Sequence, residues 1–161
     1  MDTDKNWLDP AAGAAFPDQF LYLQRLIAFR RAHECLRPAA FFTGQDHNGN
    51  GLKDLTWYQD NGSEVSPSYF ANPANHFLAF RIDGTEFGDV SASVLVMYNA
   101  YDQDLPATFP TNLPGRRWYL AGDTAVAPAS GAYFLAPGSD ILQTAATYSS
   151  RARSLAVFVE Q

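Results

Sequence analysis

The apolar residues near the start of the chain form two stripes with helical spacing. The residues of one stripe are spaced by 4, 3 and 4 positions, and they are Phe16, Phe20, Leu23 and Ile27. A second stripe has the same spacing and consists of Tyr22, Leu26, Phe29 and His33. At about 100° per residue, the two stripes lie about 130° apart on a helix. We therefore predict a helix made to lie between two layers, one of them outside this chain; the alternative is a central helix wrapped by its own domain.

The limits of this helix follow from its flanking residues. Pro17 and Asp18 open it, and the Asp18 carboxylate is favourable at the positive end of the helix dipole. Pro38 prevents the helix from continuing beyond Arg37. We predict a helix over residues 18–36, preceded by a polar, irregular segment of 15 residues.

After Pro38 the pattern changes to short apolar runs separated by Gly, Asn, Asp and Pro. The runs cover residues 39–42, 55–59, 76–82, 93–99, 107–109, 117–120, 133–135 and 154–160. Short runs without intervening helices are typical of an antiparallel β-sandwich or barrel. Residues 66–70 are expected to form a single helical turn. The last run is almost continuously apolar, which predicts a central strand covered on both faces.

Length and composition agree with a mainly β domain preceded by one long helix. The chain has 161 residues, of which 47% are hydrophobic, 14% aromatic and 17% charged. This is enough for one packed domain and an appendage. We predict an N-terminal extension and helix over residues 1–37 and a β-sandwich domain over residues 38–161.

The net charge narrows the classes of partner. Eleven Lys and Arg residues against 17 Asp and Glu residues give a formal charge of −6. This balance argues against nucleic acid and against anionic membranes as partners, and it is compatible with a neutral polysaccharide. Cys35 is the single cysteine and the sequence opens without an apolar leader. We expect a cytoplasmic protein, provided that no leader lies upstream.

Several segments, in this order, resemble the isoamylase-type glycogen debranching enzymes. Residues 26–33 are similar to the last helix of the catalytic barrel in that family, and residues 6–9 to the segment just before it. Further matching segments are residues 41–44, 54–58, 60–64, 77–84, 95–100, 118–119, 122–124 and 153–157. The individual pieces are unspecific, but their order and spacing extend over nearly the whole chain.

The resemblance implies glycoside hydrolase family 13, in which a (β/α)8 barrel is followed by a C-terminal β-sandwich like that of the α-amylases. It implies retaining hydrolysis of α-1,6 branch linkages in glycogen or starch by two carboxyl groups roughly 5 Å apart. In the family these groups lie on barrel strands that precede the matching region. The resemblance therefore implies no catalytic residue in this chain, no required cofactor, and the barrel as its partner.

A glycine-rich loop is the sharpest local motif. Oxygen-bearing residues at calcium-loop spacing flank Gly51, and the possible ligands are Asp46, Asn48, Asn50, the carbonyl of Leu52, and Asp54. Position 12 of such a loop is Trp57 instead of the bidentate Glu of an EF-hand. Two readings stay open: a weak calcium site, or a turn held by its own side chains.

The remaining candidate residues give weaker signals. His33, His47 and His76 lack ligand spacing, and we expect no metal site built on histidine. Five carboxylates lie at predicted turns, and two of them could in principle form a glycosidase pair. We expect them to be solvated turn residues, and they are Asp83, Glu86, Asp89, Asp102 and Asp104. In Trp57-Tyr58 and Trp118-Tyr119, one ring at most of each pair can face outward.

Two alternative functions stay open. Exposed aromatic rings would suit an α-glucan-binding module, and the glycine-rich loop would suit a calcium-dependent interaction domain. We also expect a homodimer through the exposed helix face.

Overall fold

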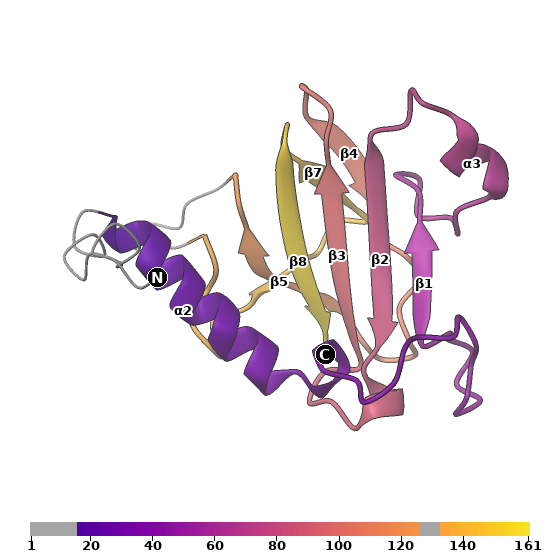
Figure 1. Ribbon diagram of the computed structural model, residues 1–161, viewed down its shortest axis with the longest axis horizontal. Helices are drawn as coiled ribbons and strands as arrows, with labels where there is room; N and C mark the ends of the chain where they lie inside the picture. Colours follow the sequence, from indigo (N-terminus) through magenta and orange to yellow (C-terminus); the bar gives the residue numbers. More distant parts are fainter. Residues whose placement is uncertain (1–15, 126–132) are drawn as a thin grey trace, which may run out of the picture.

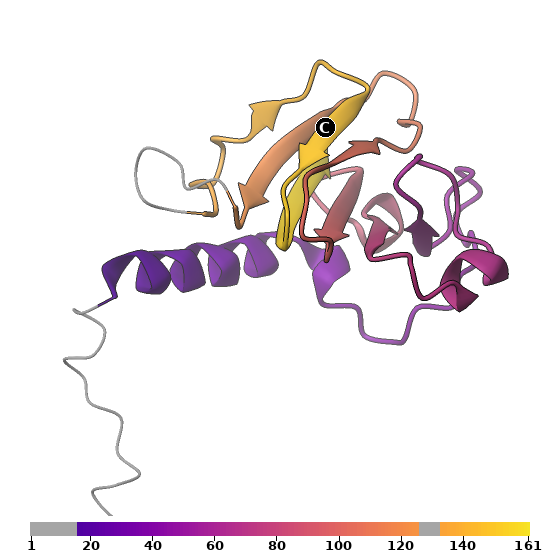
Figure 2. The same cartoon turned by 90° about the horizontal axis from the view of Figure 1, so that it is seen from above.

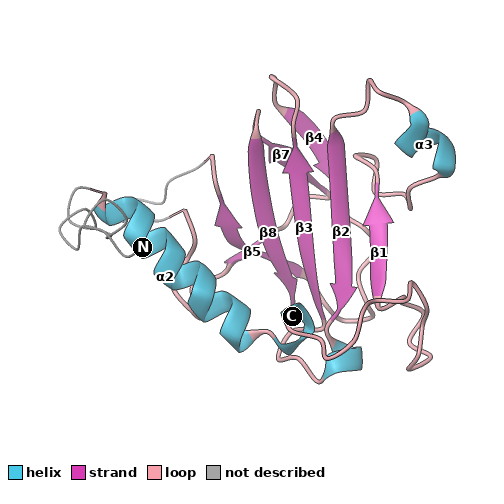
Figure 3. Ribbon diagram, viewed as in Figure 1, coloured by secondary structure: helices cyan, strands magenta, loops and turns pink. Residues whose placement is uncertain are grey.

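The computed structural model describes residues 16–125 and 133–161, so residues 6–9 lie outside the described part. Its helical elements are α2 (Pro17–Ala32), the 3-10 turn η2 (Glu34–Leu36), α3 (Pro67–Ala71) and the 3-10 turn η3 (Thr85–Phe87). The strands are β1 (Leu55–Tyr58), β2 (Phe77–Asp83), β3 (Ser93–Asn99), β4 (Leu105–Thr108), β5 (Trp118–Asp123), β6 (Ile141–Leu142), β7 (Thr147–Ser150) and β8 (Ser154–Glu160). Figure 1 shows their arrangement, and Figure 3 shows that strands dominate it.

The strands form two antiparallel sheets. A six-stranded sheet has the order β1-β2-β3-β8-β5-β6, and β4 pairs with β7 in a small second sheet. Every neighbouring pair is antiparallel. The predicted mainly β, antiparallel sandwich preceded by one long helix is confirmed.

The large sheet is covered on both faces because its central strands are apolar at consecutive positions. On β3, Val94 and Val96 belong to the apolar cluster next to α2, whereas Leu95 and Met97 belong to the cluster next to β4 and β7. β8 divides its side chains in the same way, with Phe158 fully buried on the β4–β7 side. This arrangement confirms the prediction that the last strand is central and covered on both faces.

A buried ion pair crosses the core between β2 and β8. Arg81 Nη2 lies 2.5 Å from Glu160 Oε2, and both side chains are almost inaccessible to solvent. Ser93 Oγ donates to the same carboxylate oxygen, and the backbone N–H of Leu113 donates to the other at 2.7 Å. Because both charges have partners, burying them carries a smaller penalty than burying either alone.

Helix α2 lies against one edge of the sandwich as a separate layer, as Figure 2 shows. Tyr22, Leu26 and Phe29 pack against the cluster that contains Val94 and Phe134. The other stripe faces away and is exposed by 52–59%, and its members are Phe16, Phe20, Leu23 and Ile27. The helix therefore has two apolar faces, and within the described residues the sandwich covers one of them.

Some predicted boundaries were wrong. α2 ends at Ala32 because His33 adopts an extended conformation, and residues 34–36 form a 3-10 turn instead of a last helical turn. Residues 39–42 are irregular, β4 begins at Leu105, and the 133–135 run contributes an isolated bridge between Phe134 and Gly122. β6 and β7 were missed because both are short and largely exposed.

In residues 16–125 and 133–161, no helix is long and apolar enough to cross a membrane.

Candidate functional site

The loop of residues 43–54 joins the helical part of the chain to β1, and Asp54 anchors it. The Asp54 carboxylate accepts hydrogen bonds from the backbone N–H groups of Thr43 (2.6 Å), Gly44 (2.7 Å) and Leu55 (2.7 Å). The Thr43 hydroxyl donates a fourth at 3.0 Å. Burial raises the pKa of Asp54, but these hydrogen bonds outweigh it and lower the pKa from its usual value. All four lone-pair directions of the carboxylate are therefore engaged.

Asp46 organises the tip of the same loop. Its Oδ1 accepts the N–H of Gly49 at 2.7 Å, and its Oδ2 accepts the N–H of Gly51 at 2.9 Å. The N–H of Gly51 makes the largest contribution to a lowered pKa of Asp46. Gly49 and Gly51 have φ angles of 74° and 88°, which a residue with a Cβ rarely adopts. The carboxylate thus holds a turn that only glycine forms easily.

Asn48 and Asn50 extend this pattern. Asn48 Oδ1 accepts the N–H of Asn50, and Asn50 Oδ1 accepts the N–H of Leu52. Their amide nitrogens donate to Asp83 Oδ2, at 3.2 and 2.7 Å respectively, and also to the Thr85 hydroxyl. The hydrogen bonds of the Asp46, Asn48, Asn50 and Asp54 side chains support the reading of a turn held by its own side chains. Calcium binding by this loop stays a prediction.

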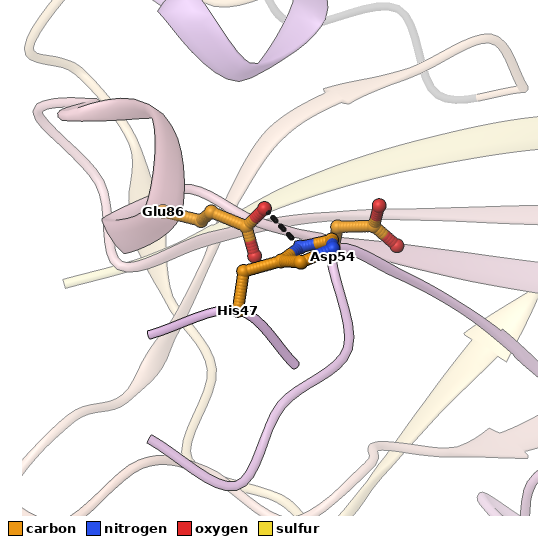
Figure 4. Close-up of side chains that lie close together, drawn as sticks. All are labelled: His47, Asp54 and Glu86. Atoms are coloured by element: carbon orange, nitrogen blue, oxygen red, sulfur yellow. Dashed lines mark hydrogen bonds and ion pairs between the residues drawn. The ribbon is translucent and has the colours of Figure 1, made fainter. Parts of the chain in front are cut away.

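The loop also brings His47 beside Asp54 and Glu86, as Figure 4 shows. His47 Nδ1 lies 2.6 Å from Glu86 Oε1, and its Nε2 lies 3.1 Å from the Thr43 hydroxyl. Candidate ligand atoms of the three residues lie within 4.8 Å of one another. Tetrahedral zinc needs four ligands, and the Asp54 oxygens are already engaged. Chemically, this group is a hydrogen-bonded clasp between the loop and η3.

A second clasp joins the end of α2 to the loop after η3. His33 Nδ1 lies 2.8 Å from Asp89 Oδ1, and the side chains of both residues are buried. The N–H groups of Cys35 and Ser91 also donate to the Asp89 carboxylate. Burial raises the pKa of Asp89, but the hydrogen bonds from His33, Ser91 and Cys35 outweigh it and lower the pKa to about 2. Burial raises the pKa of the Cys35 thiol, so the thiolate is disfavoured.

The other predicted candidates have separate environments. Asp83 accepts hydrogen bonds from Thr85, Asp104 pairs with Arg151 at 2.6 Å, and Asp102 is exposed. His76 packs edge-on against the ring of Tyr101. Asp83, Glu86, Asp89 and Asp104 therefore each have their own hydrogen-bond or ion-pair partners.

The aromatic pairs follow the strand alternation that we predicted. Trp57 on edge strand β1 is 38% exposed, whereas Tyr58 packs against the opposite cluster. Trp118 is buried, and its indole N–H donates to the carbonyl of Pro110. Trp57 is thus the one member of these two pairs that presents a large apolar ring to solvent.

A pocket that the sequence did not reveal lies between α2 and the segment before β6. Its volume is about 400 Å³, and its polar lining consists of Arg25, His33, Ser91, Asp140 and Gln161. Phe29, Ala121 and Leu135 supply apolar walls. These residues come from separate parts of the chain, and no local spacing could have grouped them.

Comparison with known proteins gives a consistent result. A family model described as "Isoamylase, C-terminal" matches residues 54–159. Isoamylase of Flavobacterium sp is 37% identical over 161 residues, covering 99% of this chain and 21% of the relative. Isoamylase of Pseudomonas amyloderamosa is 33% identical over 163 residues, covering 100% of this chain and 20% of the relative.

A solved structure supports the fold independently. Pullulanase type I from Bacillus subtilis str. 168, complexed with maltose, has a TM-score of 0.59 and 16% identity. The similarity covers 96% of this chain and 17% of that protein. The chain therefore spans about a fifth of the length of these two isoamylases.

Proposed function

Because the chain belongs to the isoamylase C-terminal family, we propose that it is the non-catalytic C-terminal β-domain of an enzyme that debranches α-1,6-linked glucans such as glycogen or starch. Its role is to cover the last helix of the catalytic barrel and so to stabilise the barrel. The exposed apolar stripe of α2 carries the proposal, since its other face already packs on the sandwich. A catalytic barrel is the partner that this face fits, and the relatives are long enough to contain one.

The proposal predicts that the chain does not cleave glucan by itself. Glu86 and Asp54 lie close together, but Glu86 is hydrogen-bonded to His47 and the Asp54 carboxylate already accepts four hydrogen bonds. A retaining glycosidase needs two carboxyl groups, roughly 5 Å apart, that face one glycosidic bond. Incubation with amylopectin or glycogen should release no reducing ends. Measurable release that survives purification to homogeneity would remove the claim of a non-catalytic domain.

A chimera tests the supporting role directly. The C-terminal fifth of the Flavobacterium isoamylase is replaced by this chain, and thermal inactivation of the debranching activity is followed. Leu23→Glu combined with Ile27→Glu should shorten the half-life of the chimera, because it places charges where the barrel packs. In the isolated chain the same double variant should leave the melting temperature almost unchanged, because both side chains are about half exposed.

The matched control is Leu26→Ala, on the face of α2 that packs against the sandwich. This variant should destabilise the isolated chain and the chimera alike, because it loses contacts that both contain. Equal half-lives for the chimera with and without the Leu23→Glu, Ile27→Glu pair would contradict the proposed role of α2.

A second candidate function is α-glucan binding, and the exposed Trp57 ring favours it. Trp57 lines a groove with Lys53, Glu64 and Phe70, so polar groups border an aromatic surface. Electrophoresis in gels containing glycogen should retard the wild-type chain and retard Trp57→Ala less. Wild-type mobility that glycogen does not change would exclude useful binding.

A further inference from the structure

The pocket between α2 and the segment before β6 has the dimensions and lining of a small-molecule site. Its volume of about 400 Å³ falls within the range of about 300–1,000 Å³ typical of ligand pockets. Apolar walls from Phe29 and Leu135 alternate with a few polar groups, which is also typical of such sites. The hydrogen-bonded group of His47, Asp54 and Glu86 does not line this pocket, and the proposed barrel contact does not use it.

Ser91 is the strongest sign that the pocket takes a polar ligand. The residue is 2% exposed and its hydroxyl lacks a hydrogen-bond partner among the described residues. A buried hydroxyl without a partner carries the full cost of its lost hydration. The Ser150 hydroxyl and Glu86 Oε2 are also buried without a partner, but neither residue lines this pocket. A ligand hydroxyl in the pocket would satisfy Ser91 and leave Ser150 as it is.

The other polar groups offer both donors and acceptors. Arg25 Nη1 donates to the carbonyl of Phe134 at 2.8 Å, and the guanidinium has further N–H groups to offer. Asp140 supplies carboxylate oxygens, one of which accepts a 3.3 Å hydrogen bond from Gln161. The Nδ1 atom of His33 is hydrogen-bonded to Asp89, which leaves Nε2 on the opposite side of the ring.

Charge favours a neutral ligand over an ionic one. An anion in the pocket would meet the Asp140 carboxylate, and a cation would meet the Arg25 guanidinium. Burial raises the pKa of Asp140 from its usual value, which is the direction expected for a carboxylate in a poorly hydrated site. Hydroxyl groups both donate and accept, so a neutral polyhydroxyl molecule fits this mixed set of groups.

We propose that this pocket binds a glucosyl unit of an α-glucan chain between α2 and the sandwich, with Ser91, Asp140 and Arg25 contacting its hydroxyl groups. The choice of glucan among neutral polyhydroxyl ligands rests on the proposed function. A site here would hold glucan at the junction between the last barrel helix and the β-domain.

Isothermal titration calorimetry of the whole chain with maltotriose tests this site. Ser91→Ala should weaken binding about fivefold to tenfold, the loss expected for one neutral hydrogen bond. Asp140→Asn should weaken binding by tenfold or more, because hydrogen bonds to a charged group are stronger. The matched controls are Ser150→Ala and Asp104→Asn, which should bind as the wild type does.

The results of this titration test the pocket independently of the proposed function. No measurable heat with 10 mM maltotriose overturns the pocket, and so does binding that Ser91→Ala and Asp140→Asn leave intact. Losses of equal size in the controls also overturn it. The chimera measures stabilisation of a barrel without reference to glucan binding, so either proposal can fail while the other stands. Near-wild-type melting temperatures for all four variants are required for the comparison.

Discussion

The two apolar faces of α2 are built from similar residues and have different surroundings. Phe29 on one face packs 5.0 Å from the ring of Phe134, whereas Phe20 on the other is 56% exposed. Both residues belong to the same helix and both stripes have the same spacing. Helical spacing alone therefore does not decide which face is buried, and the exposed second face is the one that the proposed barrel contact would cover.

The hydrogen bond between His33 and Asp89, the clasp at the end of α2, holds only the face of the helix that packs on the sandwich. His33 and Asp89 tie the helix to the loop after η3, next to the apolar contacts of Phe29. The side chains of the exposed stripe, Phe16, Phe20, Leu23 and Ile27, carry no group that could form such a hydrogen bond. Perturbing each face should therefore change different properties of the chain.

The largest effect is expected from removing the clasp. Asp89→Ala leaves His33 and two buried backbone N–H groups without their acceptor, so we expect a loss of about 3 kcal/mol in the free energy of unfolding. Urea unfolding followed by fluorescence measures it. Asp104→Ala is the control, because its ion pair with Arg151 is exposed, and such pairs contribute roughly 0–1 kcal/mol. Equal losses of unfolding free energy in Asp89→Ala and Asp104→Ala would contradict a stabilising role for the His33–Asp89 clasp.

Acid should open the same clasp by protonating Asp89. The folded-state pKa of about 2 is below the unfolded value of about 3.9. This contribution to stability is therefore complete above about pH 4 and is lost as the pH falls toward 2, amounting to about 2 kcal/mol. In Asp89→Asn the dependence on pH over this range should flatten. An unchanged profile in that variant would show that other carboxylates cause the acid sensitivity.

The exposed face should govern self-association, which is a smaller effect. We expect the isolated chain to form dimers as its concentration rises, through the stripe of Phe16, Phe20, Leu23 and Ile27. Phe20→Glu should shift sedimentation toward the monomer, while Gln24→Glu, an exposed change outside the stripe, should not. A wild-type chain that stays monomeric at high concentration would count against association through this face.

The smallest effect is expected from calcium, which acts far from α2. The oxygens of Asp46, Asn48 and Asn50 accept hydrogen bonds from the loop itself. A bound ion would have to replace these bonds, so millimolar Ca²⁺ should raise the melting temperature by about 2 °C at most. Asp46→Asn should remove any such rise. A shift of 10 °C or more would establish a calcium site in place of a self-held turn.

Sequence reasoning predicted elements whose pattern is local. Apolar spacing along the chain was enough to predict α2, β2, β3 and β8. It was enough because this spacing follows from which side chains of each element pack against other elements. β7 could not be predicted, since Thr147, Ser149 and Ser150 form a strand only through pairing with β4. The early end of α2 depends on His33 meeting Asp89, which is 56 residues away.

The candidate site shows the same limit. The glycine-rich loop was recognised from its spacing, and its self-held alternative was already open. Its links to Asp83 and Glu86 could not be anticipated, because β2 and η3 deliver these residues from more than 30 positions away. The pocket lined by Ser91 and Asp140 has no local signature at all.

A matched pair of variants on α2 is the most direct test of its two faces. Phe29→Ala and Phe20→Ala remove the same atoms from the same helix, and the free energy of urea unfolding is compared for the isolated chain. We expect a loss of about 2–3 kcal/mol for Phe29→Ala, whose ring is partly buried, and of no more than about 0.5 kcal/mol for Phe20→Ala. Equal losses, or a larger loss for Phe20→Ala, would contradict a helix with one face on the sandwich and the other awaiting a partner.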